Sequence, residues 1–156
     1  MKKLLILLLL VPSLSWGADS EKGLTAYNQG DYATAIKEWT PLAEQGNASA
    51  QSNLGIMYSK GVGVVQNYKT AVKWYTLAAE QGHAKAQYNL GYRYGNGQGV
   101  LQDNIYAHMW FNIAASSGVS EATEGRTLIQ KNMTTADISK AQELARQCVN
   151  KNYKDC

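Results

Sequence analysis

Apolar side chains recur at every fourth position in one stretch near the centre of the chain. Within residues 84–95 the recurring side chains are Ala86, Leu90 and Tyr94. This spacing places them on one face of an α-helix. Residues 96–102 contain two glycines and predict a loop, because glycine permits backbone angles that are closed to other residues. A second amphipathic stretch runs from the N-cap candidate Asp103 to Gly118. The pattern therefore predicts an antiparallel pair of helices.

The same pattern occurs twice, in residues 48–82 and 84–118, with corresponding positions 36 residues apart. The corresponding pairs include Leu54 and Leu90, Gly55 and Gly91, Tyr58 and Tyr94, Gly61 and Gly97, Trp74 and Trp110, and Gly82 and Gly118. A fixed period of roughly 20 to 50 residues is typical of repeat proteins, in which each unit buries its apolar face against its neighbours. The first copy predicts helices at residues 48–60 and 67–81.

Small residues recur at four positions inside the predicted helices, namely Gly55, Gly91, Ala71 and Ala107. A missing or short side chain lets the backbones of neighbouring helices approach one another. These residues are therefore interpreted as packing positions and not as functional ones.

The segments on either side of the two copies follow the pattern less closely. Residues 18–46 predict a degenerate helix pair of the tetratricopeptide type, with a shorter turn between its helices. Residues 119–156 lose the period and predict a C-terminal helical cap, with helices at residues 121–131 and 135–150. Terminal units are expected to differ because one of their faces meets solvent. The sequence thus predicts an all-α fold, an α/α superhelical solenoid of antiparallel helix pairs.

Residues 1–17 have the character of a secretory signal peptide. Lys2 and Lys3 give a positive start, and residues 4–11 form an unbroken apolar run. Small residues before the junction predict cleavage after Gly17. The alternative is a membrane anchor, but a spanning helix needs about twenty apolar residues and this run is much shorter. We expect an exported protein, periplasmic or secreted, with no membrane insertion after cleavage.

Removal of the signal peptide changes the charge balance. The sequence has 15 basic and 12 acidic residues, and Lys2 and Lys3 are two of the basic ones, so the mature chain has a formal net charge of +1. No basic block remains in it. We therefore expect no nucleic-acid partner and no binding to an anionic membrane surface.

Two cysteines, Cys148 and Cys156, lie close together at the C-terminus. In an oxidising compartment such a pair predicts a disulfide that ties the last residues to the final helix. A redox or metal-binding pair is the alternative. It is disfavoured because the Cys-x-x-Cys spacing is absent and neither histidine is near in sequence.

The sequence contains no motif for catalysis, metal binding or cofactor binding. No serine has a lysine three positions later, which is the arrangement that a serine acylation site requires. His83 lies between the two copies and His108 lies on a helix face beside Ala107, each without paired carboxylates at ligand spacing. The loop at Gly97 lacks the lysine and hydroxyl residue of a phosphate-binding loop. We expect no catalytic, metal or cofactor-binding residue, and hence not an enzyme.

Positions where the two copies differ are the candidates for binding a partner. Tyr88 and Tyr92 fall roughly opposite Leu90 on the helical wheel, and Ser52 and Ile56 are their counterparts in the first copy. In a helix-pair solenoid the first helix of each pair usually lines the concave side, so these four side chains are candidate partner-binding residues. The alternative, which we favour for the two tyrosines, is packing against the neighbouring repeat or the cap.

The motifs of the two copies resemble the Sel1-like repeat, a relative of the tetratricopeptide repeat. They are Ala-x-x-x-Leu-Gly-x-x-Tyr, Gly-x-Gly-Val, Asn/Asp-x-x-x-Ala-x-x-Trp and Ala-Ala-x-x-Gly, within residues 48–118. Residues 23–46 are similar to the tetratricopeptide-like opening often found before such repeats. The resemblance implies an α/α superhelix that mediates protein–protein contacts, often as an exported bacterial adaptor or host-interaction factor.

Two functions are compatible with this resemblance. The favoured one is an exported, non-catalytic interaction scaffold or adaptor for a protein or peptide partner. The alternative is a cell-wall-associated protein that binds or hydrolyses β-lactams or muropeptides, as has been described for some cysteine-rich exported relatives. Those relatives have regularly spaced cysteine pairs within their repeats, and the present repeats have none.

Overall fold

The computed structural model describes residues 16–156. The predicted signal peptide falls almost wholly on residues 1–15, which lie outside the described residues. Over the described range the chain forms eight α-helices. Their bounds are α1 Trp16–Asn28, α2 Tyr32–Glu44, α3 Ala48–Lys60, α4 Tyr68–Ala79, α5 Ala84–Asn96, α6 Asn104–Ser116, α7 Ser120–Gln130 and α8 Thr135–Asn150. None of these helices is long and apolar enough to cross a membrane.

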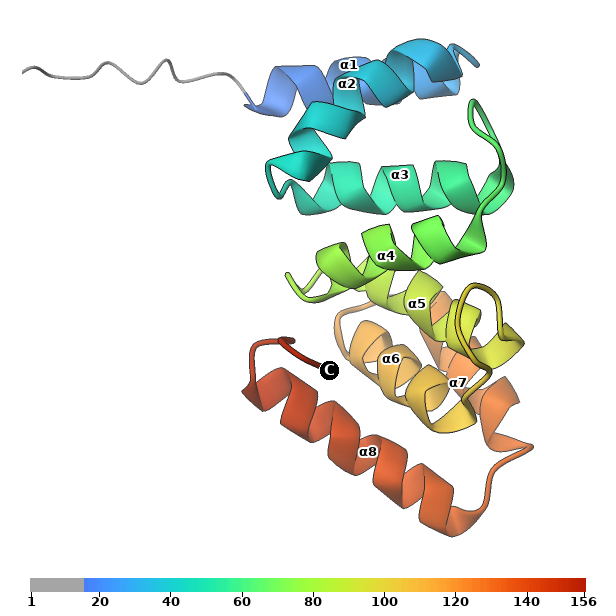
Figure 1. Ribbon diagram of the computed structural model, residues 1–156. Coiled ribbons are helices and arrows are strands. Elements are labelled where there is room, and N and C mark those ends of the chain that lie inside the picture. Colours follow the sequence, from blue (N-terminus) through green and yellow to red (C-terminus); the bar gives the residue numbers. More distant parts are fainter. Residues whose placement is uncertain (1–15) are drawn as a thin grey trace, which may run out of the picture.

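The first six helices stack in chain order (Figure 1). The pairs α1 and α2, α3 and α4, and α5 and α6 pack within themselves, and the second helix of each of the first two pairs also packs on the first helix of the next. Each pair thus buries one face internally and another against its neighbour, as expected of a repeat protein. This arrangement confirms the predicted all-α solenoid.

Capping side chains fix where the helices begin. Asp103 accepts hydrogen bonds from two backbone N–H groups of α6, at 2.8 and 3.0 Å. Its counterpart Asn67 accepts one from the N–H of Thr70 at 2.9 Å. At the start of α8, Thr134 forms a capping box with Asp137. Each cap satisfies N–H groups that have no partner within the helix, so these polar residues determine the helix boundaries.

Glycines allow the two helices of a repeat to approach closely. A Cβ atom placed on Gly55 would lie 2.5 Å from Cε1 of the Tyr75 ring. One placed on Gly91 would lie 3.0 Å from Cδ1 of Phe111, the residue that corresponds to Tyr75. The helix–helix contact therefore consists of an aromatic ring laid on a glycine, which confirms that the repeated glycines are packing positions.

Two buried glutamines connect successive helix pairs. Nε2 of Gln51 donates to the carbonyl oxygen of Ala43 at 2.9 Å, and Nε2 of Gln87 donates to that of Ala79 at 3.2 Å. In both cases the acceptor lies in the last turn of the preceding helix, where carbonyl groups lack a partner within the helix. The repeat therefore contains a polar contact between units as well as apolar packing.

The C-terminal helices do not continue the pairing. α7 and α8 each pack against α6 rather than chiefly against one another. α8 contributes Ala145 and Cys148 to the core that it shares with α4, α5 and α6. On the other side of α6, Ala122 of α7 packs in a cluster with Phe111. The predicted cap thus holds α6 from two sides.

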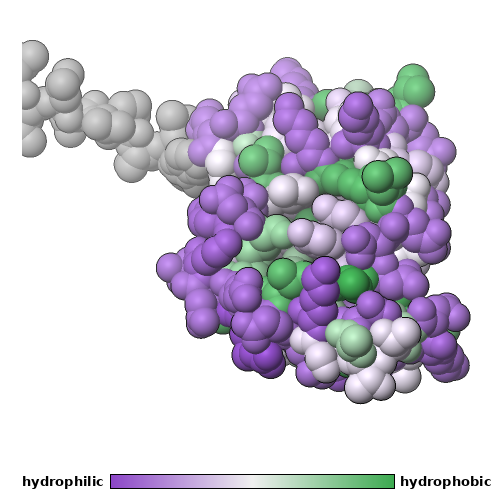
Figure 2. Space-filling view, turned by 60° about the horizontal axis from the view of Figure 1, so that its bottom comes forward, coloured by the Kyte–Doolittle hydropathy of each residue, from purple (hydrophilic) through white to green (hydrophobic). Residues whose placement is uncertain are grey.

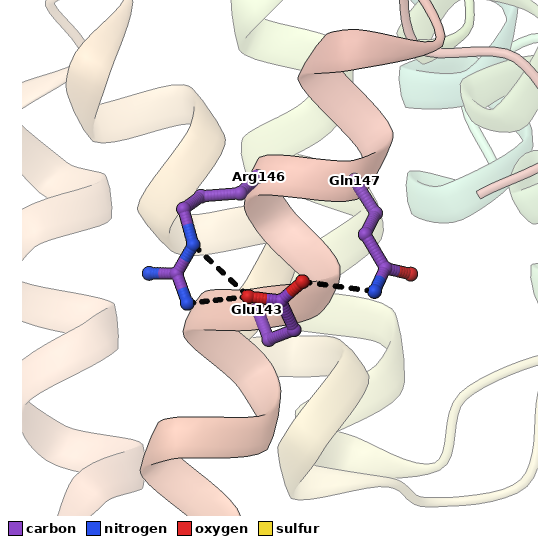
Figure 3. Close-up of polar contacts among 3 residues, drawn as sticks. All are labelled: Glu143, Arg146 and Gln147. Atoms are coloured by element: carbon purple, nitrogen blue, oxygen red, sulfur yellow. Dashed lines mark hydrogen bonds and ion pairs between the residues drawn. The ribbon is translucent and has the colours of Figure 1, made fainter.

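The outer face of α8 is polar. Glu143 accepts hydrogen bonds from Arg146 and Gln147 (Figure 3), and these bonds, with that of Gln147 contributing most, lower the pKa of the Glu143 carboxyl. Both members of the Glu143 and Arg146 pair are exposed, so the pair contributes little to stability. This face of α8 is solvated.

The chain ends in a covalent closure. A disulfide joins Cys148 in α8 to Cys156, with their Cα atoms 5.4 Å apart. The residues between them turn back from the end of α8 toward the turn between α4 and α5 (Figure 1).

Candidate functional site

A groove of about 980 Å³ lies between α5 and α7. Both helices pack on α6 but have only a small contact with each other, so the space between them stays open. The apolar side chains that line it are Tyr88, Tyr92, Phe111, Leu128 and Ile129. A cavity of this size with apolar walls and a few polar groups has the character of a binding site.

Phe111 of α6 forms the floor of the groove. It is held between two glycines, because a Cβ atom on Gly91 of α5 would lie 3.0 Å from its ring and one on Gly125 of α7 would lie equally close at 3.0 Å. Gly91 approaches Cδ1 and Cε1 of the ring, and Gly125 approaches Cε1, Cζ and Cε2, so the backbones of both flanking helices pack on the same ring. This contact fixes the separation of α5 and α7, and with it the width of the groove.

Tyr88 and Tyr92 form the α5 wall and have different environments. The ring of Tyr88 is half-buried against Phe111, with the ring centroids 5.7 Å apart. Tyr92 is 43% exposed. The guanidinium of Arg93 lies 4.8 Å from the centroid of the Tyr92 ring, an attractive cation–π geometry that restrains the exposed ring. Tyr88 thus belongs partly to the core, as the packing interpretation predicts, whereas Tyr92 is available at the surface.

Charged side chains lie along α7 at the edge of the groove. Glu121 and Glu124 are exposed on its first half, and Lys131 follows its last residue. Burial raises the pKa of the Tyr88 phenol, and the negative charges of Glu121 and Glu124 raise it further. The two carboxylates are therefore close enough to the Tyr88 hydroxyl for their potential to act on it.

Exposed large apolar side chains are few on the described surface. Figure 2 shows one face of the molecule, where hydrophobic patches interrupt a mostly hydrophilic surface. Of these exposed residues, Leu128 at 64% and Tyr92 at 43% line the same groove from α7 and α5. Two exposed apolar side chains thus face the groove from its two walls.

The counterparts of the tyrosines in the first repeat are placed differently. Ser52 is buried, with 2% of its surface exposed, so it is not displayed to a partner. Ile56 is half-buried and packs against the core of α4 to α6. The structure therefore does not bring the four candidate residues onto one surface, and it brings together only Tyr88 and Tyr92.

The two histidines have structural roles in the described chain. Nδ1 of His83 accepts a hydrogen bond from the N–H of Ala86 at 3.2 Å and so caps α5. His108 is fully buried, and its Nε2 lies 2.7 Å from Nε2 of Gln130. Burial lowers the pKa of both imidazoles. Within residues 16–156, no cluster of three or more histidine, cysteine or carboxylate side chains is arranged to hold a metal ion.

The contribution of α7 to the groove was missed by sequence reasoning. Gly125, Leu128 and the two glutamates lie after the point where the 36-residue period stops, so no second copy exists to compare with them. One exposed leucine in a mostly polar helix gives only a weak signal. Its meaning depends on the position of α5, which the structure provides.

These features define a class of protein, an α/α solenoid of repeated helix pairs with an amphipathic groove at one end. The family model for the Sel1 repeat matches residues 48–83 and 84–119. The chain therefore contains two Sel1 repeats.

Solved structures support this assignment. A protective antigen present in uropathogenic Escherichia coli strains, which displays an SLR fold, is 30% identical over 88% of the chain, with a TM-score of 0.83. A Sel1 repeat protein from Oxalobacter formigenes is 30% identical over 85% of the chain, with a TM-score of 0.70. The chain spans 30% of the first protein and 55% of the second. A comparison with curated protein sequences gave no significant match.

Proposed function

We propose that this protein is an exported, non-catalytic interaction module that holds a protein or peptide partner in the groove between α5 and α7. The observation that supports this most directly is the pair of exposed apolar side chains, Tyr92 and Leu128, on opposite walls of one groove. Exposed apolar surface of this kind is unfavourable in water unless a partner covers it. Sel1 repeats typically mediate protein–protein interactions, which agrees with this use of the groove.

Export is part of the proposal, to the periplasm or to the outside of the cell. It is supported by the predicted signal peptide and by the pairing of Cys148 with Cys156, since such disulfides persist in oxidising compartments. Mass spectrometry of the protein recovered from the cell envelope and the medium would test it. A mature N-terminus at Ala18 is the expected result, and an intact N-terminus in the cytosol would contradict export.

The partner can be sought by cross-linking in the native cell envelope followed by affinity capture. The test variant is Tyr92→Ala with Leu128→Ala, which removes the exposed apolar surface of the groove. A matched control is Val65→Ala with Val149→Ala, two valines that are 88% and 43% exposed and lie outside the groove. A protein captured by the wild type and the control but not by the test variant is the expected outcome. Capture that is equal for all three would contradict the proposed site.

Lack of catalysis is tested separately. The purified mature protein is expected to give no turnover of a chromogenic cephalosporin above that of buffer. Turnover by the wild type that survives repurification would overturn the non-catalytic assignment.

A further inference from the structure

We propose that the occupant of the groove is an extended peptide segment that places a lysine or arginine beside an apolar side chain. This inference rests on the proposed function, and it specifies the chemistry of the partner. It follows from three properties of the groove: its volume, its charge and the position of that charge relative to the apolar walls.

The volume of the groove favours an extended chain over a helix. Glu121 and Lys131 mark its two ends along α7, and ten helical residues correspond to about 15 Å. A helix of that length, with a diameter of about 10–12 Å, would occupy roughly 1,400 Å³. An extended strand of that length, about 4.8 Å by 10 Å in section, occupies roughly 700 Å³. A strand of that length fits within the groove of about 980 Å³, whereas part of a helix would stand out of it into solvent. The strand would contain about four or five residues at roughly 3.3 Å each.

Glu121 and Glu124 make one end of the groove negative, and Lys85 is the described basic side chain whose charge acts on Glu121. Neither Glu121 nor Glu124 lies within ion-pair distance of a basic side chain among the described residues, whose ion pairs are Lys22 with Glu38 and Arg146 with Glu143. Ser120 donates a hydrogen bond to the Glu121 carboxylate at 3.0 Å. A bound cation would therefore meet two carboxylates that have no described basic side chain within ion-pair distance.

The carboxylates lie next to the aromatic wall, and this adjacency specifies the order of side chains in the partner. The charges of both glutamates act on the Tyr88 hydroxyl, and the Tyr88 ring also contacts Phe111 in the floor of the groove. A cation at Glu121 and Glu124 would lie near the Tyr88 ring, where cation–π attraction adds to the ionic one. The neighbouring apolar side chain would then cover Phe111, Leu128 and Tyr92.

The test is selection of random seven-residue peptides displayed on a surface, using the immobilised mature protein. Tyr92→Ala with Leu128→Ala serves for counter-selection, so that only sequences dependent on the groove are retained. These sequences are expected to be enriched in lysine or arginine within three positions of leucine, isoleucine, phenylalanine or tryptophan. Selection on Glu121→Lys with Glu124→Lys should enrich aspartate or glutamate at the same place.

Affinity measurements on the most enriched synthetic peptide complete the test. Charge reversal at Glu121 and Glu124 should weaken its binding at least tenfold, and raising the salt concentration should weaken binding to the wild type. The control is Glu21→Lys with Glu44→Lys, two exposed glutamates on α1 and α2, which should change the affinity less than twofold.

The outcomes separate this inference from the proposed function. The inference would be overturned if the groove-dependent peptides showed no enrichment in basic residues, or if their binding did not respond to charge reversal. The groove would then remain an interaction site. Recovery of no groove-dependent peptide would also overturn the inference. The proposed function would then fail only if cross-linking also found no partner that depends on Tyr92 and Leu128.

Discussion

The ring of Tyr153 lies against Gly82, in the turn between α4 and α5, so that a Cβ atom on Gly82 would be 3.1 Å from Cε2 of the ring. Tyr153 has a φ of 65°, and its neighbours Asn152 and Asp155 also have positive φ, at 52° and 51°. Such angles are uncommon for residues other than glycine. The disulfide between Cys148 and Cys156 encloses this turn and holds the tail against the end of the first repeat.

Replacing both cysteines by serine should destabilise the protein. For a loop this short, the chain-entropy model gives a loss of about 2 to 3 kcal/mol in the free energy of unfolding. Urea denaturation followed by circular dichroism measures it. A reducing agent should have the same effect on the wild type and none on the double variant. Equal stability of the two proteins without reductant would contradict the prediction.

Gly55→Ala should also be destabilising, although alanine is the better helix former. The added Cβ would lie 2.5 Å from the Tyr75 ring, which is itself buried at 2% exposure and has little room to move. Overpacking costs about 1 to 3 kcal/mol, whereas the gain in helix propensity is about 1 kcal/mol. We expect a net loss of up to about 2 kcal/mol in the free energy of unfolding, measured by chemical denaturation. Asn53→Ala in the same helix is the control and should not show this loss.

The stability of the protein should decrease as the pH falls below about 6.5. Burial lowers the pKa of His83 from the ordinary value of 6.5, so the unfolded chain binds a proton before the folded chain does. The contribution of neutral His83 to the free energy of unfolding is therefore complete above that pH. It is lost as the pH falls through the pKa that His83 has in the folded protein. Protonation also removes the Nδ1 acceptor that caps α5 and places a positive charge at a helix N-terminus.

His83→Asn isolates this effect, because asparagine is the corresponding residue of the first repeat. Asn47 caps α3 by accepting a hydrogen bond from the N–H of Ala50 at 2.9 Å. The variant should retain its cap and lose less stability between pH 7.5 and 5.5 than the wild type. Part of the pH dependence should remain, since burial also lowers the pKa of His108. Thermal unfolding across this pH range measures the stability of both proteins. Parallel curves of stability against pH for the variant and the wild type would exclude a role for His83.

Ser117→Gln should stabilise the protein by about 1 kcal/mol, the usual contribution of one hydrogen bond. In the first repeat, Nε2 of Gln81 donates to Oε1 of Gln51 at 2.8 Å. The corresponding acceptor, Oε1 of Gln87, is buried and has no hydrogen-bond partner among the described residues. Ser117 occupies the position that corresponds to Gln81. Chemical denaturation measures the gain. Ser116→Gln is the control for position, and an equal gain there would refute the explanation.

Sequence reasoning predicted the helical skeleton well because the period and the capping residues are local properties. Asp103 caps α6 as expected, its counterpart Asn67 caps α4, and Gly55 and Gly91 each accept an aromatic ring. The buried glutamines Gln51 and Gln87 were not identified, although they are also 36 residues apart. A repeated polar residue gives no sign that it is buried until the acceptor in the preceding helix is known.

The candidate site was predicted only in part. Tyr92 is exposed, as a partner-binding residue should be. Ser52, the counterpart of Tyr88 in the first repeat, is buried. The helical wheel treats both positions as outward-facing, because it contains no information about the next unit. The α7 wall could not be predicted, since its placement depends on Phe111 fitting between Gly91 and Gly125.

α7 contributes half of the groove but lies outside the repeats. This arrangement has a consequence for how the binding specificity of such proteins can diversify. A residue inside a repeat must satisfy the packing of the units before and after it, whereas Glu121, Glu124 and Leu128 have exposed side chains. Substitutions at these three positions can alter what the groove accepts while the helix pairs remain unchanged. The repeats would then act as a constant frame, and one helix outside them, α7, would supply the variation in specificity.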